Sequence, residues 1–290
     1  MMLTRRRFLR TTLLGGAAAA TGVYAWRIEP HWIEIVRRHL PIRGLPDALA
    51  GRTLVQLSDI HVGRRVDDAY VIDTFQRVAA LAPDIVVFTG DFISYDDTVF
   101  DRMARVYRYL PRGRLATLGV LGNHDYGHAW SHPEVAARVT EALAPFGLVM
   151  LRNEVKDVSG LQIAGLDDLW SHQFSPERGL ARLDRGRASL VLSHNPDSVD
   201  EAGWDGFEGW ILSGHTHGGQ CKAPFLPPPL LPVRNRRYTS GEFALSGNRR
   251  LYINRGVGHL LRVRMNVRPE VTMFELCGEA HSTSSEQGDD

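Results

Sequence analysis

The chain has 290 residues, of which 43% are apolar and 23% are charged, and its formal net charge is +1. This composition suits a globular protein with one sizeable core. The balanced charge leaves no dominant basic surface to neutralise phosphates, so nucleic acid is not expected as a partner. The two cysteines, Cys221 and Cys277, lie far apart and lack zinc-finger spacing, which argues against a structural zinc site. Two free thiols are favoured over one disulfide.

The N-terminal residues 1–26 have the pattern of a targeting segment. A basic stretch at 4–10, Thr-Arg-Arg-Arg-Phe-Leu-Arg, precedes a short apolar run at 11–26. This order indicates an export signal, and the paired arginines before Phe-Leu resemble the bacterial twin-arginine signal. The resemblance implies the twin-arginine export machinery as a partner and a periplasmic or cell-envelope location at the inner membrane. The run is short for a bilayer span, so cleavage, retention as an anchor and a helix lying on the membrane's inner face all stay open.

The other boundaries follow from composition. Residues 27–50 are expected to form a connector that contains a short helix at 32–39, followed by turn signals at Pro41, Gly44 and Pro46. The folded domain is expected over 51–277. The final stretch, 278–290, is rich in Ser, Glu, Asp and Gly and is expected to be a disordered tail.

The folded part begins with an apolar strand at 52–57, followed by Ser58-Asp59-Ile60-His61. Residues two apart on an extended chain point the same way, so Asp59 and His61 are expected to form half of a metal site. Apolar residues at helical spacing predict a helix over 67–81, which Pro83 stops.

Two further strand–helix units follow. A strand at 84–89 ends in Gly90-Asp91, and a helix is expected near 100–110. The next strand ends in Gly122-Asn123-His124-Asp125, and a helix is expected over 133–143. This alternation predicts a mainly parallel sheet covered by helices.

The second half of the chain is richer in strands. Short runs at 148–166 predict a hairpin at a sheet edge. The strand at 189–193 is followed by His194, and the strand at 210–213 by Gly214-His215-Thr216-His217. Late strands near 238–245, 249–254 and 270–276 are expected to complete a second, more antiparallel sheet.

Five apolar strands thus end in residues that bind metals, at the sheet edge where ligands bind in α/β proteins. Mixed carboxylate, amide and imidazole groups suit two adjacent Mn²⁺, Fe²⁺ or Zn²⁺ ions better than an all-oxygen Mg²⁺ or Ca²⁺ site. The candidate ligands are Asp59, His61, Asp91, Asn123, His194, His215 and His217.

The ordered motifs D-x-H, G-D, G-N-H-D, a late His and G-H-x-H resemble those of the calcineurin-like metallophosphoesterases, over residues 53–276. The resemblance implies an α/β fold, a two-sheet αββα sandwich with a dinuclear site at the strand ends. It also implies which residues hold each ion: Asp59, His61 and His217 for one, Asn123, His194 and His215 for the other, with Asp91 bridging both.

The same resemblance implies a mechanism in which a hydroxide shared by the two ions attacks phosphorus. His124 is expected to be the catalytic group that protonates the leaving group or stabilises charge on the phosphoryl oxygens. The alternative is that His124 only donates or accepts a hydrogen bond that orients a metal ligand. In protein phosphatases of this family, an Asp at the position of Ser94 orients the motif histidine, which is His124 here. Its absence argues against that activity and leaves the orienting partner of His124 open, with Asp96 or Asp97 as a candidate replacement.

Together, the signal segment and the sequence Gly-His-Thr-His-Gly-Gly-Gln resemble an exported, membrane-associated branch of this family. The resemblance implies a phosphodiesterase or pyrophosphatase acting on a membrane- or envelope-linked substrate, such as a UDP-diacylglucosamine-like lipid A precursor. The alternatives are a phosphomonoesterase or nucleotide phosphodiesterase with soluble substrates, and a metal-binding scaffold that has lost catalysis. The protein is expected to be a monomer.

Two features are candidates for substrate contact. The loop at 222–237 is proline-rich and apolar, then basic; it is expected either to dock on anionic lipid headgroups or to pack Phe225 and Leu230 on the core. Arg64 and Arg65 are candidates to bind a second phosphate, with solvated surface arginines as the alternative.

Overall fold

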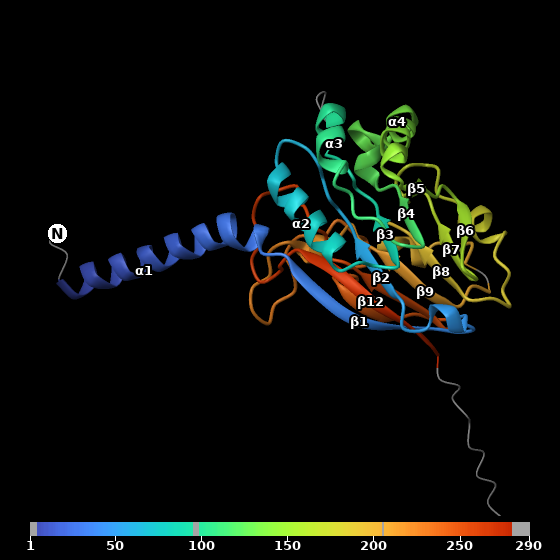
Figure 1. Ribbon diagram of the computed structural model, residues 1–290. Coiled ribbons are helices and arrows are strands. Elements are labelled where there is room, and N and C mark those ends of the chain that lie inside the picture. The colour runs from blue at the N-terminus through green and yellow to red at the C-terminus, as the bar shows by residue number, and fades with distance from the viewer. Residues whose placement is uncertain (1–4, 95–98, 205, 280–290) are drawn as a thin grey trace, which may run out of the picture.

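The computed structural model describes residues 5–94, 99–204 and 206–279. Two six-stranded sheets stack face to face, with helices over the outer face of the first (Figure 1). The first sheet has the order β1 (Glu34–Ile42), β12 (Glu270–Gly278), β2 (Thr53–Leu57), β3 (Ile85–Thr89), β4 (Ala116–Val120), β5 (Val149–Met150). The second has the order β10 (Gly241–Ala244), β11 (Arg249–Ile253), β9 (Gly209–Ser213), β8 (Ser189–Leu192), β7 (Leu161–Gly165), β6 (Glu154–Val158). The expected two-sheet α/β sandwich is confirmed.

Apolar side chains on both faces of the strands hold the layers together. Leu54 and Val87 of the first sheet pack with Leu212 of the second, and all three are fully buried. The alternate side chains, such as Val55 and Phe88, pack in the cluster beneath the helices. Burial on both faces explains why these strands are continuous apolar runs in the sequence. The α-helices are α1 (Arg5–Val23), α2 (Asp68–Ala80), α3 (Val99–Tyr107), α4 (Pro133–Leu143) and α5 (Pro176–Leu180).

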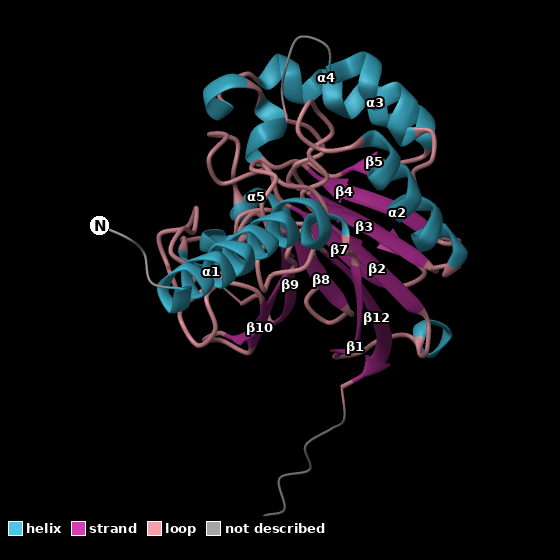
Figure 2. Ribbon diagram, turned by 90° about the vertical axis from the view of Figure 1, so that its left-hand side faces the viewer, coloured by secondary structure: helices cyan, strands magenta, loops and turns pink. Residues whose placement is uncertain are grey.

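Strand direction sets where the site forms. β2, β3 and β4 are parallel neighbours, as are β8 and β9, so their carboxyl ends lie together along an edge of each sheet. β1 runs parallel to β12, which is antiparallel to β2. The start of β1 therefore lies at the same edge as the ends of β2–β4, and the preceding α1 projects from that side of the body (Figures 1 and 2).

Two expectations from the sequence are wrong. Residues 32–39 do not form a helix; they lead into β1, which pairs with β12 from Glu34↔Glu270 to Ile42↔Gly278. The run Ile33 to Val36 is rich in β-branched residues, and pairing with a neighbouring strand outweighs its weak helical spacing. Second, β12 lies in the first sheet instead of the second, because it pairs with β2.

The other expected elements are confirmed. α2, α3 and α4 lie within two or three residues of their expected bounds, and β6 and β7 form an antiparallel hairpin at the edge of the second sheet. Asp67 caps α2 by accepting a hydrogen bond from the amide of Ala69 at 2.9 Å. Cys221 and Cys277 are both free thiols. Within the described residues, no helix has the length and hydropathy needed to cross a membrane.

Asp84, at the start of β3, ties the first sheet together far from the strand ends that carry the site. Its buried carboxylate accepts hydrogen bonds from the Thr53 amide at 2.8 Å and from Arg114 Nη2 at 2.8 Å. Burial alone would raise the pKa of Asp84, but these two donors outweigh it and lower the pKa. We expect Asp84→Ala to lower the free energy of unfolding by about 2 kcal/mol, because the Thr53 amide loses its partner.

The pH dependence of that stability has a defined sign. Because the folded-state pKa of Asp84 is depressed, its contribution is present above the unfolded-state pKa of about 3.9 and is lost as the pH falls through the folded value. Urea unfolding of wild type and variant between pH 3 and pH 7 measures this difference. The matched control is Asp73→Ala, which removes an exposed ion pair with Arg77 and should change little. Equal effects of both variants would contradict the expectation.

Candidate metal centre

The expected ligands gather at the carboxyl ends of the strands, as two triads of buried side chains. In each triad the candidate donor atoms all lie within 4.8 Å of one another. The first triad is Asp59, His61 and His217, and the second is Asp91, His194 and His215. The first triad draws on the ends of β2 and β9, and the second on the ends of β3, β8 and β9, so the two triads together need four strands in place.

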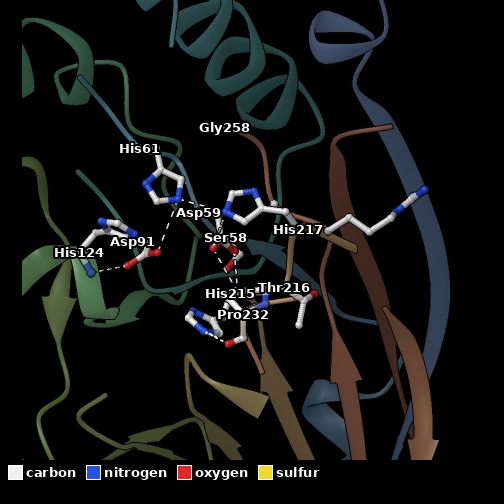
Figure 3. A network of polar contacts seen from close by, with 12 residues as sticks. Ser58, Asp59, His61, Asp91, His124, His215, Thr216, His217, Pro232 and Gly258 are labelled. Atoms are coloured by element: carbon white, nitrogen blue, oxygen red, sulfur yellow. Dashed lines mark hydrogen bonds and ion pairs between the residues drawn. The ribbon is translucent and has the colours of Figure 1, made fainter. Parts of the chain in front are cut away.

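In the first triad two imidazole nitrogens face each other. His61 Nε2 lies 3.1 Å from His217 Nε2, and the latter lies 3.4 Å from Asp59 Oδ1. Figure 3 shows the rings of His61 and His217 turned toward each other above Asp59. Donor atoms around a zinc ion with bonds of about 2.0 Å are separated by roughly 3.3 Å. The spacing of these donors therefore fits a shared cation.

The second triad has the same character. His194 Nε2 lies 3.1 Å from His215 Nδ1 and 3.3 Å from Asp91 Oδ2. Asn123, in the turn after β4, adds its side-chain oxygen at 3.2 Å from His194 Nε2. Three different donor types thus surround one point, and the amide oxygen of Asn123 is neutral, so it adds a ligand without adding charge.

Asp91 lies between the two triads. Its Oδ2 atom is 3.3 Å from His194 Nε2 and 3.5 Å from His61 Nε2, which belongs to the other triad. Its Oδ1 atom accepts a hydrogen bond from the backbone amide of His124 at 2.9 Å, which fixes the plane of the carboxylate (Figure 3). A single oxygen of Asp91 is therefore within reach of the space enclosed by each triad.

Hydrogen bonds behind the rings fix which nitrogen faces the centre. His194 Nδ1 donates to the Thr89 carbonyl at 2.7 Å, and His215 Nε2 donates to the Pro232 carbonyl at 2.8 Å. Such bonds orient metal-binding histidines and set their tautomers. Ser94 Oγ does the same for His61 Nδ1 at 3.2 Å.

The Ser94 hydroxyl contacts His61, so it does not supply the orienting partner of His124 that the sequence leaves open. At the position where the protein phosphatases carry Asp, this chain uses a hydroxyl to orient His61. The candidate replacements Asp96 and Asp97 lie outside the described residues.

The backbone at the ligands is not extended, contrary to the expected geometry. After β2, β3 and β9 the chain turns sharply and enters the left-handed region, which costs a non-glycine residue roughly 1–2 kcal/mol. Side chains two apart still converge, but through these turns instead of through strand alternation. Five candidate ligands have positive φ: Asp59 (51°), His61 (52°), Asp91 (55°), His215 (71°) and His217 (50°). Strain concentrated on ligands is typical of functional sites.

Two motif glycines are required by close approach to the ligands. A Cβ atom on Gly122 would lie 2.2 Å from Asp91 Oδ1, and one on Gly214 would lie 2.4 Å from Asp59 Oδ2. Any side chain at these positions would displace a carboxylate. The glycines before Asn123 and His215 are therefore part of the site's construction.

Burial keeps most of the histidines neutral. It lowers the pKa of His61 to about 3 and that of His215 to about 3, and it holds the pKa of His217 well below the usual value. Neutral imidazole is the form that binds a metal. These three side chains are therefore ready to act as ligands at neutral pH.

Charges of opposite sign meet around the second triad. Burial opposes ionisation of both His194 and Asp91, but the attraction between their opposite charges outweighs the effect of burial. The pKa of His194 is therefore raised well above its usual value, and the pKa of Asp91 is held well below its usual value. Burial raises the pKa of Asp59 to about 6, with His194 opposing the shift. Keeping the Asp59 carboxylate charged therefore costs free energy unless a cation lies nearby.

The remaining candidates lie at the rim. His124 is half-buried, and its ring lies edge-on to that of His61 with 5.1 Å between centroids. Arg64 and Arg65 are exposed, and Arg65 Nη1 donates to the Leu260 carbonyl at 2.7 Å. The geometry brings His124 to the centre and leaves Arg65 engaged with a neighbouring loop.

Sequence reasoning missed four residues around the centre. Arg264 is fully buried and donates to the carbonyls of Arg255 and Gly258, in a loop that packs against Asp59. No spacing or motif marks it. Asp168 follows β7 and is buried, and burial raises its pKa to about 7. The rule that polar residues after apolar strands line the crevice would have found it. The other two are Trp130 and Trp170, which flank His124 and His215.

Comparison with known proteins agrees with this geometry. The family model described as calcineurin-like phosphoesterase matches residues 52–219. This range begins at β2 and contains every residue of both triads. The chain belongs to the calcineurin-like phosphoesterases. It is a metallophosphoesterase, a hydrolase whose two buried triads are consistent with a dinuclear metal centre.

Relatives align over nearly the whole chain. The chain is 34% identical to phosphodiesterase YaeI of Escherichia coli, covering 95% of this chain and 100% of the relative. It is 33% identical to the uncharacterized metallophosphoesterase YkuE of Bacillus subtilis, with 94% and 98% covered. It is 26% identical to the UDP-2,3-diacylglucosamine pyrophosphatase LpxG of Chlamydia trachomatis, with 93% and 96% covered.

Proposed function

We propose that the protein hydrolyses a phosphodiester or pyrophosphate bond in a membrane-linked substrate, with two divalent ions held by the triads. The observation that carries this proposal is the position of Asp91, whose Oδ2 atom lies within 3.5 Å of a histidine nitrogen in each triad. A carboxylate in that position holds two ions close together. The mixed nitrogen and oxygen donors favour Mn²⁺, Fe²⁺ or Zn²⁺.

The chain's own groups have separate roles in this proposal. Asp59, His61 and His217 hold one ion, and Asn123, His194 and His215 hold the other, with Asp91 shared. Bound in this way, the ions supply an activated water and Lewis acidity toward the phosphoryl oxygens. His124 touches the substrate from the rim and protonates the leaving oxygen. The hydrogen bond that its backbone amide donates to Asp91 Oδ1 holds the backbone of His124 beside the centre.

The membrane-linked substrate is supported by where exposed apolar side chains gather. Among the described residues, twelve of the sixteen exposed large apolar side chains lie in three segments. Seven are in 9–32, three in 225–230 and two in 261–263. Phe225 and Leu230 are exposed instead of packed on the core, which favours the docking alternative for this loop.

The three segments adjoin one another on the side of the metal centre. The amide of Lys222 donates to the Met265 carbonyl at 2.9 Å, and the amide of Arg264 donates to the Ala25 carbonyl at 2.9 Å. The Pro232 carbonyl meets His215, so the proline-rich loop begins and returns at the centre. We name the exposed apolar side chains of 225–230 and 261–263 the apolar rim.

Four basic side chains share the loop that carries the apolar residues 225–230. Lys222, Arg234, Arg236 and Arg237 are all exposed, and they lie in the same loop as Phe225. Apolar and basic groups together suit anionic lipid headgroups over an acyl layer. The relative from Chlamydia trachomatis, named for action on UDP-2,3-diacylglucosamine, supports a nucleotide-linked lipid as the substrate class.

The location is part of the proposal. Residues 1–26 act as a twin-arginine signal or anchor, which puts the enzyme at the envelope face of the inner membrane. α1 begins with basic residues, and its described side chains are exposed to solvent. A helix of this kind suits recognition by export machinery or a membrane surface.

A vesicle assay tests this function. We expect the Mn²⁺-loaded full-length protein to hydrolyse bis(p-nitrophenyl) phosphate faster than p-nitrophenyl phosphate, and to bind vesicles that contain phosphatidylglycerol. The triple variant Phe225→Ser, Leu226→Ser, Leu230→Ser should bind these vesicles about tenfold or more weakly, because each buried apolar side chain contributes at least about 1.5 kcal/mol.

The control is Leu115→Ser, an exposed leucine outside the three segments, at the start of β4. It should bind vesicles like the wild type. Faster monoester hydrolysis that is indifferent to vesicles would support a soluble substrate instead. Metal binding without hydrolysis of either ester would support a scaffold.

A further inference from the structure

Two tryptophans form a wall beside the metal centre. Trp130 lies in the turn after His124, and Trp170 lies in the loop after β7. Their ring centroids are 4.5 Å apart with 33° between the planes. Trp130 is 6.4 Å from the ring of His124, and Trp170 is 4.6 Å from the ring of His215. The wall thus runs from the rim histidine to a histidine of the second triad.

The backbone at Trp130 is strained. Ala129 and Trp130 have φ angles of 53° and 58°, so two consecutive non-glycine residues occupy the left-handed region. Each costs roughly 1–2 kcal/mol. This strained turn does not serve to bury the indole in the core, since Trp130 is 37% exposed. A strained turn that holds a large apolar ring in contact with water beside a metal centre indicates a role in function.

Trp170 is the fixed half of the wall. Its amide donates to Asp168 Oδ2 at 2.7 Å, and Ser171 Oγ donates to the Asp168 carbonyl at 2.7 Å. Asp168 itself is fully buried. The indole of Trp170 is therefore held by a short turn against His215, and Trp130 covers it from the solvent side.

We propose that Trp130 and Trp170 form a stacking platform for the planar base of a nucleoside whose phosphate lies at the metal centre. This inference rests on the proposed function and names the part of the substrate that the ions do not hold. Aromatic side chains stack on bases with about 1–3 kcal/mol per base. In a nucleotide one sugar ring separates the base from the phosphate. The indoles of Trp130 and Trp170 lie next to the rings of His124 and His215, so a base on the wall would leave its phosphate near the metal centre.

A base fits this wall better than an acyl chain does. The two indoles lie against each other with 33° between their planes and offer a flat aromatic surface, which suits a planar partner. Acyl chains suit the broad apolar rim at 225–230 and 261–263. A nucleotide-linked lipid would then be held at both ends, its base on the wall and its lipid at the rim, with the phosphates between them.

The test compares two diesters that share one leaving group. Thymidine 5′-(p-nitrophenyl phosphate) and ethyl p-nitrophenyl phosphate both release p-nitrophenolate and differ only in the nucleoside. We expect Trp130→Ala to raise KM for the thymidine ester about tenfold or more relative to KM for the ethyl ester. Trp130→Phe should restore most of the affinity. Trp32→Ala, which removes an exposed tryptophan in contact with Arg268, is the control.

A second readout does not need catalysis. Binding of uridine monophosphate to the Mn²⁺-loaded protein should quench tryptophan fluorescence, and Trp130→Ala should weaken this binding about tenfold or more. Equal loss for both esters would overturn the platform, because it would mark a structural role for the wall. Failure of the wild type to bind the nucleotide would also overturn it. Nucleotide binding without hydrolysis of either ester would instead support the platform and overturn the proposed function.

Discussion

Asp91→Asn is expected to lower kcat/KM for bis(p-nitrophenyl) phosphate by at least about 1000-fold, which corresponds to roughly 4 kcal/mol of transition-state stabilisation. Asn keeps the shape of the side chain, and its oxygen still accepts the hydrogen bond from the His124 amide. It loses the negative charge on the atom that both triads share. The charge that holds two cations side by side is therefore removed while the fold is retained.

Three measurements make this result specific. Circular dichroism should show an unchanged fold, and elemental analysis should show fewer bound metal ions than in the wild type. Asp101→Asn, an exposed carboxylate in α3, is the control and should retain full activity. If Asp91→Asn kept wild-type activity, the shared carboxylate would have no role in the chemistry.

His124→Gln should behave differently from Asp91→Asn. Because His124 belongs to neither triad, we expect the variant to keep both metal ions. As the proton donor to the leaving oxygen, His124 should contribute about 10²–10⁴-fold to kcat for a diester with a poor, alkoxide leaving group. The loss should be much smaller for p-nitrophenyl esters, whose leaving group needs no proton.

This dependence on the leaving group separates two roles for His124. A residue that only held Asp91 in place through its backbone amide would slow both kinds of ester equally, or not at all, since the substitution leaves the backbone intact. Equal losses, or loss of bound metal in His124→Gln, would contradict the assignment of His124 as the proton donor.

The sequence predicts most of the site because the ligands are local to strand ends. Asp59, Asp91 and His215 each follow a short apolar run, and parallel strands end at a common edge. Glycine adds to the signal, since Gly122 and Gly214 are required by contacts with Asp91 and Asp59. Local rules therefore suffice to bring together residues from distant parts of the chain.

What the sequence does not predict depends on tertiary pairing. β1 and β12 are hydrogen-bonded edge to edge over nine residues, although 227 residues lie between their ends. The β-branched residues of Ile33 to Val36 suit a strand, but nothing local in this run shows that a partner strand exists. The left-handed turns at the ligands are also not predicted from the sequence: Asp and His enter that region more often than most residues do, but this preference is too weak to place a turn at a given position.

The residues around the ligands show the same limit. Trp170 reaches His215 because β7, β8 and β9 are neighbours in the second sheet, and Arg264 binds carbonyls of the loop just before it, which the fold places against Asp59. Neither has a spacing that the sequence could reveal. Asp168 is the exception, since it follows an apolar strand like the other site residues.

The most direct test of the central claim is a titration of metal-free protein with Mn²⁺, followed by electron paramagnetic resonance and by hydrolysis of bis(p-nitrophenyl) phosphate in the same samples. Two ions held around Asp91 should bind per chain, give a spin-coupled spectrum, and bring activity only as the second ion binds. A spectrum of isolated Mn²⁺ ions, or full activity with one ion bound, would contradict a dinuclear centre.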